Sequence, residues 1–143
     1  MDMAERQIWD RVLARPGQED ASPLGQLANC CRESLEVYRS LLPRTGGRQR
    51  QLLRQLVAGE EENLACLRGL GQLQGLGLRT GVQTRREYGP DALRRCWDRS
   101  QLLLGEYTAR SAMGGSGAVF RQMALRQERS CALLAALLGR CGR

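Results

Sequence analysis

Residues 24–42, LGQLANCCRESLEVYRSLL, contain the pattern that decides the fold of this chain. The apolar positions of this stretch are Leu27, Cys30, Cys31, Leu35, Tyr38, Leu41 and Leu42. They recur every three or four residues, which predicts an amphipathic helix with one buried face. The dipeptide Ser22-Pro23 is typical of a helix start, and Pro43 is typical of a helix end.

The same periodicity returns along the chain and predicts more helices. They span residues 48–70, 90–111 and 118–138, the last one ended by Gly139. A shorter amphipathic helix is expected over residues 1–15. Short loops at 43–47 and 112–117 join the long helices in pairs, and each short loop makes its pair antiparallel. The connection at 69–89 is rich in glycine, and part of it is expected to continue the second long helix.

The order of these elements predicts an all-α protein. Two antiparallel hairpins joined by a long middle connection form an antiparallel four-helix bundle with a long crossover between the second and third helices. We therefore expect a short N-terminal helix over residues 1–15 and a single bundle domain over residues 24–138. At 143 residues, the chain is long enough to bury a real core.

Composition excludes several kinds of chemistry. The chain has no histidine and no lysine, so all 22 basic residues are arginine, and mechanisms that need a histidine base or a lysine Schiff base are excluded. The net charge of +7 is spread among acids, which favours a solvated surface over a nucleic-acid site. No membrane span and no signal peptide are expected, and six cysteines without a C-x-x-C pair indicate reduced thiols in a cytoplasmic protein.

Polar residues interrupt the apolar faces of two predicted helices. Glu60 and Asn63 do so in the second long helix. In the fourth, aligning the leucines of the two helices places Gln127 and Ser130 inward, and we favour this alignment. The other alignment places Glu128 and Cys131 there. Residues three apart on a helix share a face, so each pair points to the same region of the bundle.

The two hairpins also carry a weak internal repeat. Cys31 stands seven residues before Tyr38 in the first helix, and Ser100 stands seven residues before Tyr107 in the third. With these spacings and the paired polar positions, residues 24–138 resemble the ferritin-like superfamily, and in particular the small rubrerythrin-type domains. In that family the first and third helices each carry a Glu seven residues before a Tyr, and the second and fourth each carry Glu-x-x-His. Together these residues hold two iron ions.

This chain departs from the family at most of the ligand positions. Of the six, only Glu60 keeps its residue type. The other five hold Cys31, Asn63, Ser100, Gln127 and Ser130. A di-iron centre needs about four carboxylates to balance the charge of the metals. The resemblance therefore implies a rubrerythrin-like bundle that has lost its di-iron site, with no catalytic residue and no expected cofactor.

The leading hypothesis is a non-catalytic interaction or scaffold protein. It would form a homodimer through an aliphatic helix face and would contact a further protein that the sequence does not identify. At the former ligand positions, the polar residues Asn63, Ser100, Gln127, Ser130, Tyr38 and Tyr107 are expected to hydrogen-bond around Glu60. The alternative is a metal-binding oxidoreductase or metal-storage protein, with a vestigial iron or zinc site at Glu60, Glu128, Cys131 and Cys31.

Overall fold

The computed structural model describes residues 22–78 and 89–141, which form four α-helices and one short 3-10 helix and contain no strand. The elements are α2 (Pro23–Leu41), η1 (Leu42–Arg44), α3 (Gly47–Leu73), α4 (Pro90–Ser111) and α5 (Gly117–Cys141). The predicted all-helical fold is confirmed for this part of the chain. The helix expected over residues 1–15 lies outside the described residues, as does most of the connection before α4.

The helix starts follow from local hydrogen bonding. Ser22 has an extended backbone, and its Oγ accepts a hydrogen bond from the backbone N–H of Gly25 at 3.1 Å, while Pro23 occupies the first helical position. Gly89 precedes α4 with a φ of 83°, and Pro90 again begins the helix. The carboxylate of Asp91 in the first turn of α4 complements the positive end of the helix dipole.

The glycines near the two helix ends behave differently. As the sequence predicts, part of the glycine-rich connection continues the second long helix, which runs through Gly69 and Gly71 to Leu73 before the turn made by Gly75 ends it. Gly75 has a φ of 73°, and the next N–H, that of Leu76, donates to the carbonyl oxygen of Gly71 at 2.7 Å. The prediction that Gly139 ends the last helix is wrong, because its φ is not positive and α5 runs on to Cys141.

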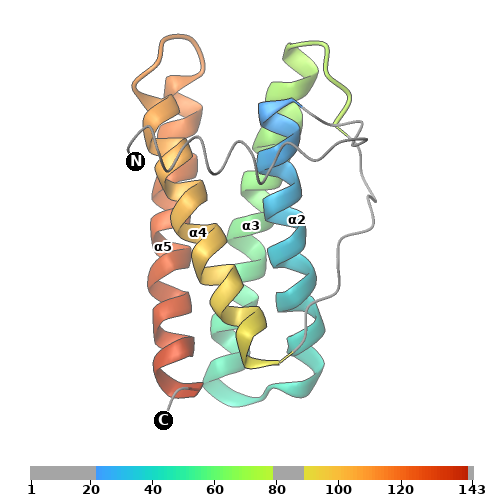
Figure 1. The fold of residues 1–143 in the computed structure, drawn as a ribbon, viewed down its shortest axis with the longest axis vertical. Coiled ribbons are helices and arrows are strands. Elements are labelled where there is room, and N and C mark those ends of the chain that lie inside the picture. Colours follow the sequence, from blue (N-terminus) through green and yellow to red (C-terminus); the bar gives the residue numbers. More distant parts are fainter. Residues whose placement is uncertain (1–21, 79–88, 142–143) are drawn as a thin grey trace.

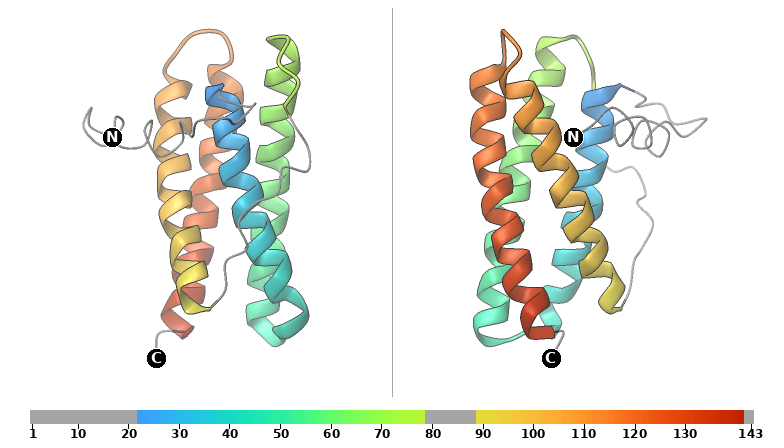
Figure 2. Two further views of the ribbon diagram at one scale, coloured as in Figure 1. Left: turned by 45° about the vertical axis from the view of Figure 1, so that its right-hand side comes forward. Right: turned by 60° about the vertical axis from the view of Figure 1, so that its left-hand side comes forward.

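The four helices pack as two hairpins laid side by side. α2 packs on α3, α4 packs on α5, and α3 and α5 form the main contact between the hairpins (Figure 1). The contact between α2 and α4 is less extensive. α3 ends at the end of the bundle where α2 begins, whereas α4 begins at the opposite end (Figures 1 and 2). The residues between α3 and α4 therefore join opposite ends of the bundle.

The apolar core is divided into two clusters. One includes Leu27, Leu35, Leu64, Leu67, Leu103, Tyr107, Phe120 and Met123. The other includes Val37, Tyr38, Leu53, Leu56, Leu93, Cys96, Leu134 and Leu137. Along α3, α4 and α5 the buried polar residues other than Glu106 fall between the two clusters. The fold thus places a polar layer in the middle of an otherwise apolar interior.

Leucines on one helix should separate core packing from surface exposure. Leu56 is 0% exposed and Leu73 is 85% exposed, and both lie on α3. We expect Leu56→Ala to lower the free energy of unfolding by about 2–5 kcal/mol, because it removes buried methyl groups and leaves a cavity. Leu73→Ala should change it by no more than about 0.5 kcal/mol. Urea unfolding followed by circular dichroism measures both, and equal losses would contradict this packing.

Candidate functional site: a buried polar layer

Seven polar residues form a layer across the middle of the bundle. They are Ser34 on α2, Glu60 and Asn63 on α3, Arg99 and Ser100 on α4, and Gln127 and Ser130 on α5. Each is at most 8% exposed. Polar side chains are costly to bury without hydrogen-bond partners, so the bonding within this layer determines whether the bundle is stable.

The side-chain amide of Gln127 is the centre of the layer. Its Nε2 donates to Oε1 of Glu60 at 2.9 Å and to Oγ of Ser100 at 2.6 Å. Its Oε1 accepts a hydrogen bond from Nδ2 of Asn63 at 3.3 Å. One amide on α5 therefore uses both of its N–H groups and its oxygen to join α3 and α4.

Asn63 extends this network to the edge of the bundle. Its Nδ2 also donates to the carbonyl oxygen of Met123 at 3.2 Å, and its Oδ1 accepts from Nε of Arg126 at 2.8 Å. Nε of the half-buried Arg126 also lies 3.6 Å from a carboxylate oxygen of Glu62. Nη2 of Arg126 donates a hydrogen bond to Sγ of Cys66 at 3.2 Å. The network thus runs from the core to a cation at the surface.

The carboxyl group of Glu60 is held toward its neutral form. Burial raises its pKa above the usual value, and the hydrogen bond from Gln127, the nearby thiol of Cys31 and the charge of Arg99 oppose that rise only in part. Within the described residues its second oxygen, Oε2, is buried and has no hydrogen-bond partner. An oxygen without a partner is less costly on a neutral carboxyl than on a carboxylate.

The thiols and phenols around Glu60 are also held neutral. Sγ of Cys31 lies 3.4 Å from the hydroxyl oxygen of Tyr107, and Sγ of Cys131 lies 3.2 Å from Oγ of Ser100. Burial is the largest cause of the raised pKa values of both thiols and of Tyr38 and Tyr107. A protonated thiol is a poor nucleophile and a poor metal ligand, so these cysteines are not activated.

The sequence analysis missed the role of Arg99. Its Nε donates to Oγ of Ser34 on α2 at 3.0 Å, and its Nη2 donates to Sγ of Cys96 at 3.3 Å. Its Nη1 lies 3.7 Å from a carboxylate oxygen of Glu33. One feature of the sequence could have revealed this role of Arg99. Arg99 stands directly before Ser100, on a helix whose other inward-facing residues the sequence pattern identifies. Arg99 supplies the only positive charge in the buried layer.

The structure separates the two alignments of the fourth helix. Gln127 is 0% exposed and Ser130 is 2% exposed, as the favoured alignment predicts, whereas Glu128 is exposed on the outer side of α5. Cys131 is buried, but it contacts Ser100 rather than a carboxylate. Of the residues in the alternative metal site, Glu60 and Cys31 are brought together, and Glu128 is not.

The residues of the layer do not fit a di-iron centre. In the ranges that the structure describes, no group of three or more His, Cys, Asp or Glu side chains could hold a metal ion. The layer contributes one carboxyl group, held toward its neutral form, and its other polar side chains are two amides, three hydroxyls and the guanidinium of Arg99. Two divalent cations need several carboxylates, which this donor set does not supply.

Comparisons with known proteins add no assignment. No family model matches the chain, and neither a curated protein nor a solved structure does. Over the described residues, none of the helices combines the length and apolar character that crossing a membrane requires.

Replacing Gln127 should show how far the layer acts as a unit. Gln127→Met keeps the size of the side chain but leaves Glu60 and Ser100 without their donor, so we expect a loss of about 2–5 kcal/mol in the free energy of unfolding. The double variant Glu60→Met/Gln127→Met removes both side chains of the hydrogen bond between Gln127 and Glu60. The loss in this double variant should fall short of the sum of the single losses by about 1 kcal/mol or more. Strict additivity in denaturant titrations would contradict the coupling.

The buried carboxyl should make stability depend on pH. Because folding raises the pKa of Glu60, the folded state holds this proton more tightly than the unfolded state, and stability falls as the pH rises above about 4.3. Glu60→Gln removes this dependence. We therefore expect the stability of the variant relative to the wild type to increase from about pH 4 until the pH passes the raised pKa of Glu60 in the folded state, and to level off above it.

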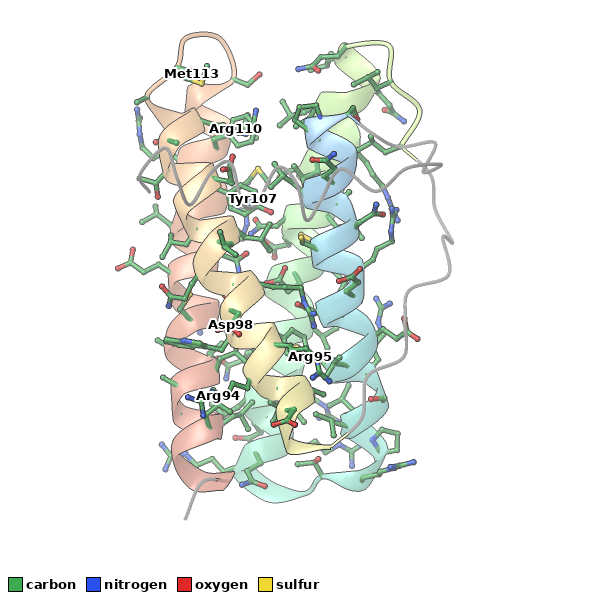
Figure 3. The ribbon with its side chains drawn as sticks, in the orientation of Figure 1. Arg94, Arg95, Asp98, Tyr107, Arg110 and Met113 are labelled. Carbon is green, nitrogen blue, oxygen red and sulfur yellow. The ribbon has the colours of Figure 1, made fainter. Side chains whose placement is uncertain are left out.

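Asp98→Asn is the control for this measurement. It removes one carboxylate from an exposed position on α4, directly before Arg99 and Ser100 of the buried layer, and Asp98 lies on the lower half of that helix (Figure 3). The difference between Asp98→Asn and the wild type should change less with pH than that of Glu60→Gln. The prediction is contradicted if the difference in stability between Glu60→Gln and the wild type stays constant or shrinks as the pH rises.

Proposed function

We propose that this protein is a metal-free relative of the ferritin-like bundle proteins, and that it acts through its surface, as an interaction or scaffold protein, rather than through a catalytic centre. The observation that carries the proposal is the state of the six positions that the resemblance assigns to metal ligands. All six are buried. Five of them hold neutral side chains, and the carboxyl group of the sixth, Glu60, has a raised pKa.

The arrangement of the helices supports the resemblance. In the ferritin-like family the second and third helices of the bundle are joined by a long crossover, and here the chain between α3 and α4 joins opposite ends of the bundle (Figure 1). The paired positions Glu60/Asn63 and Gln127/Ser130 lie on neighbouring helices, and a hydrogen bond from Gln127 to Glu60 joins the two pairs. This is the relation expected of two ligand pairs that share one centre.

The chemistry of the layer supports a structural role. Enzymes place groups with pKa values near the working pH where a substrate can reach them. Around this layer burial raises the pKa values of Cys31, Tyr38 and Tyr107 well above their usual values, which favours the unreactive neutral forms. The hydrogen bonds of Gln127 are made within the protein itself. The layer is thus suited to holding helices together.

Metal analysis tests the proposal directly. Protein purified without chelators and then incubated with iron(II) or zinc should retain well below one ion per chain after desalting, because one neutral carboxyl and two protonated thiols cannot hold the charge. Inductively coupled plasma mass spectrometry gives the ratio. Two irons per chain would contradict the proposal, and one zinc lost in Glu60→Ala would favour the metal-binding alternative.

Introducing the metal ligands of the ferritin-like family tests separately whether this chain is a relative of that family. The variant with Cys31→Glu, Asn63→His, Ser100→Glu, Gln127→Glu and Ser130→His adds three carboxylates and two imidazoles, which with Glu60 make four carboxylates and two imidazoles. We expect it to bind cobalt(II) or iron(II) and to be stabilised by the metal, as metal binding to the folded state requires. Circular dichroism melts with and without metal measure the effect.

The matched control uses the other alignment of α5. It keeps the changes at positions 31, 63 and 100 but leaves Gln127 and Ser130 unchanged and adds Cys131→His, so that the fourth helix offers Glu128-x-x-His. Because Glu128 is exposed, this variant should gain less stability from metal than the first. Equal gains in the two variants would contradict the placement of the ligand positions.

A further inference from the structure

The turn between α2 and α3 carries positive charge that no neighbouring acidic residue balances. Positions 37–59, which run from α2 through η1 into α3, contain five arginines and neither Asp nor Glu. The first of these arginines, Arg39, forms an ion pair with Glu61. The other four are exposed and lie on η1 or on the first two turns of α3: Arg44, Arg48, Arg50 and Arg54. We call these four residues the hairpin arginine patch.

The guanidinium groups of the hairpin arginine patch are available to an external partner. Within residues 22–78 and 89–141, no ion pair or side-chain hydrogen bond joins any of the four to another residue. The guanidiniums of Arg99 and Arg126 differ, because they donate to Ser34 and Asn63 inside the bundle. The positive end of the α3 dipole adds to the charge of the patch, since the first turn of this helix holds no acidic residue.

The patch occupies one end of the bundle. η1 joins α2 to α3 at the end where α4 begins, and Met113 lies at the opposite end (Figures 1 and 3). At the start of α4 two acidic and two basic residues balance each other, namely Asp91, Arg94, Arg95 and Asp98. The excess of positive charge at this end therefore belongs to η1 and the start of α3.

Phosphate groups fit the chemistry of the hairpin arginine patch. A guanidinium is planar and donates two parallel hydrogen bonds to phosphate oxygens. Arg50 and Arg54 are four residues apart and share one side of α3, whereas Arg48 projects from another side and Arg44 stands on the preceding turn. The four charges thus surround the start of α3. A nucleic acid duplex, with one negative charge about every 1.7 Å of its length, can offer phosphates from both strands to such a cluster.

Two features favour a duplex over other polyanions. Single strands bind by stacking their bases on aromatic side chains, and residues 39–59 contain no aromatic residue. Proteins that lie on a lipid surface insert large apolar side chains beside their basic residues. In the part of the chain that the structure describes, the exposed large apolar residues lie away from the patch, on the second half of α3, in the loop before α5 or on the first half of α5: Leu73, Met113, Val119 and Leu125.

We propose that the hairpin arginine patch binds the phosphate backbone of a double-stranded nucleic acid. Because its contacts are to phosphates, the binding has no sequence preference. The inference rests on the proposed role as an interaction protein and names the class of partner. The two fail separately: a chain that binds no duplex and retains no metal contradicts only the inference, whereas two irons per chain contradict the proposed function whatever the duplex result.

Salt dependence tests the binding. The full chain is titrated into labelled DNA and RNA duplexes and followed by fluorescence anisotropy. Four phosphate contacts should make the affinity fall about a hundredfold between about 50 and 200 mM salt, to the same extent for duplexes of unrelated sequence. Absence of binding to both duplexes at the lower salt concentration, or an affinity that salt does not change, would overturn the proposal.

Matched charge reversals test the position of the interface. Arg50→Glu should lower the affinity about tenfold at low salt and reduce the slope of its salt dependence by about one. Arg121→Glu is the control, because Arg121 is also exposed but lies near the start of α5, at the opposite end of the bundle (Figure 1). It changes the net charge equally and should lower the affinity by less than about twofold. Equal losses would overturn the proposal, and circular dichroism melts check that both variants fold.

Competition tests the class of partner. Unlabelled duplex should displace the labelled duplex at a lower concentration of negative charge than single-stranded DNA, polyglutamate or vesicles of phosphatidylserine and phosphatidylcholine. More effective displacement by the vesicles would assign the patch to a lipid surface, and more effective displacement by polyglutamate would assign it to an acidic protein. Either result, or stronger binding of the single strand, would overturn the assignment to a duplex.

Discussion

The hydrogen bonds of a single amide, that of Gln127, hold the centre of this bundle together. Burying polar groups in a helical core is unfavourable unless each finds a partner, and Gln127 provides partners for Glu60 and Ser100 from a third helix. Because the amide is neutral, it does this without bringing another charge into a medium of low dielectric constant. The two apolar clusters therefore pack on either side of a layer whose centre is held by the hydrogen bonds of a neutral amide.

Burial holds both Glu60 and the neighbouring Cys31 toward their neutral forms. It raises the pKa values of both groups above their usual values, and the negative charge of an ionised Glu60 would raise that of Cys31 further, whereas the hydrogen bond from Cys31 opposes the rise for Glu60. Arg99 offsets part of this cost for Glu60, but its own hydrogen bonds go to Ser34 and Cys96. Groups that would be reactive in an open, charged site are here held as hydrogen-bonding side chains.

The sequence predicts the fold and the inward positions well, because both follow from helical periodicity. Gln127 and Ser130 were placed inward by aligning the leucines of two helices, and both are buried. The hydrogen bonds themselves could not be predicted, because they depend on the relative rotation and height of the helices. Arg126 shows this limit, since it bonds to Asn63, which is 63 positions away in sequence, and no local pattern marks that pair. The predicted end of the last helix at Gly139 is wrong, because a glycine ends a helix in this way only where its φ is positive, and that of Gly139 is not.

The polar layer also restricts how the two hairpins can slide past each other. Apolar side chains such as Leu67 and Leu134 would still find apolar neighbours after a shift along the helix axes, because leucines recur on each inner face. The bond between Gln127 and Glu60 joins the two hairpins, and a shift of one turn, about 5.4 Å, is longer than any hydrogen bond can span. Such a shift would leave the Glu60 carboxyl in the apolar core without its donor. The layer thus selects one arrangement of the helices over the alternatives that the apolar core alone would permit.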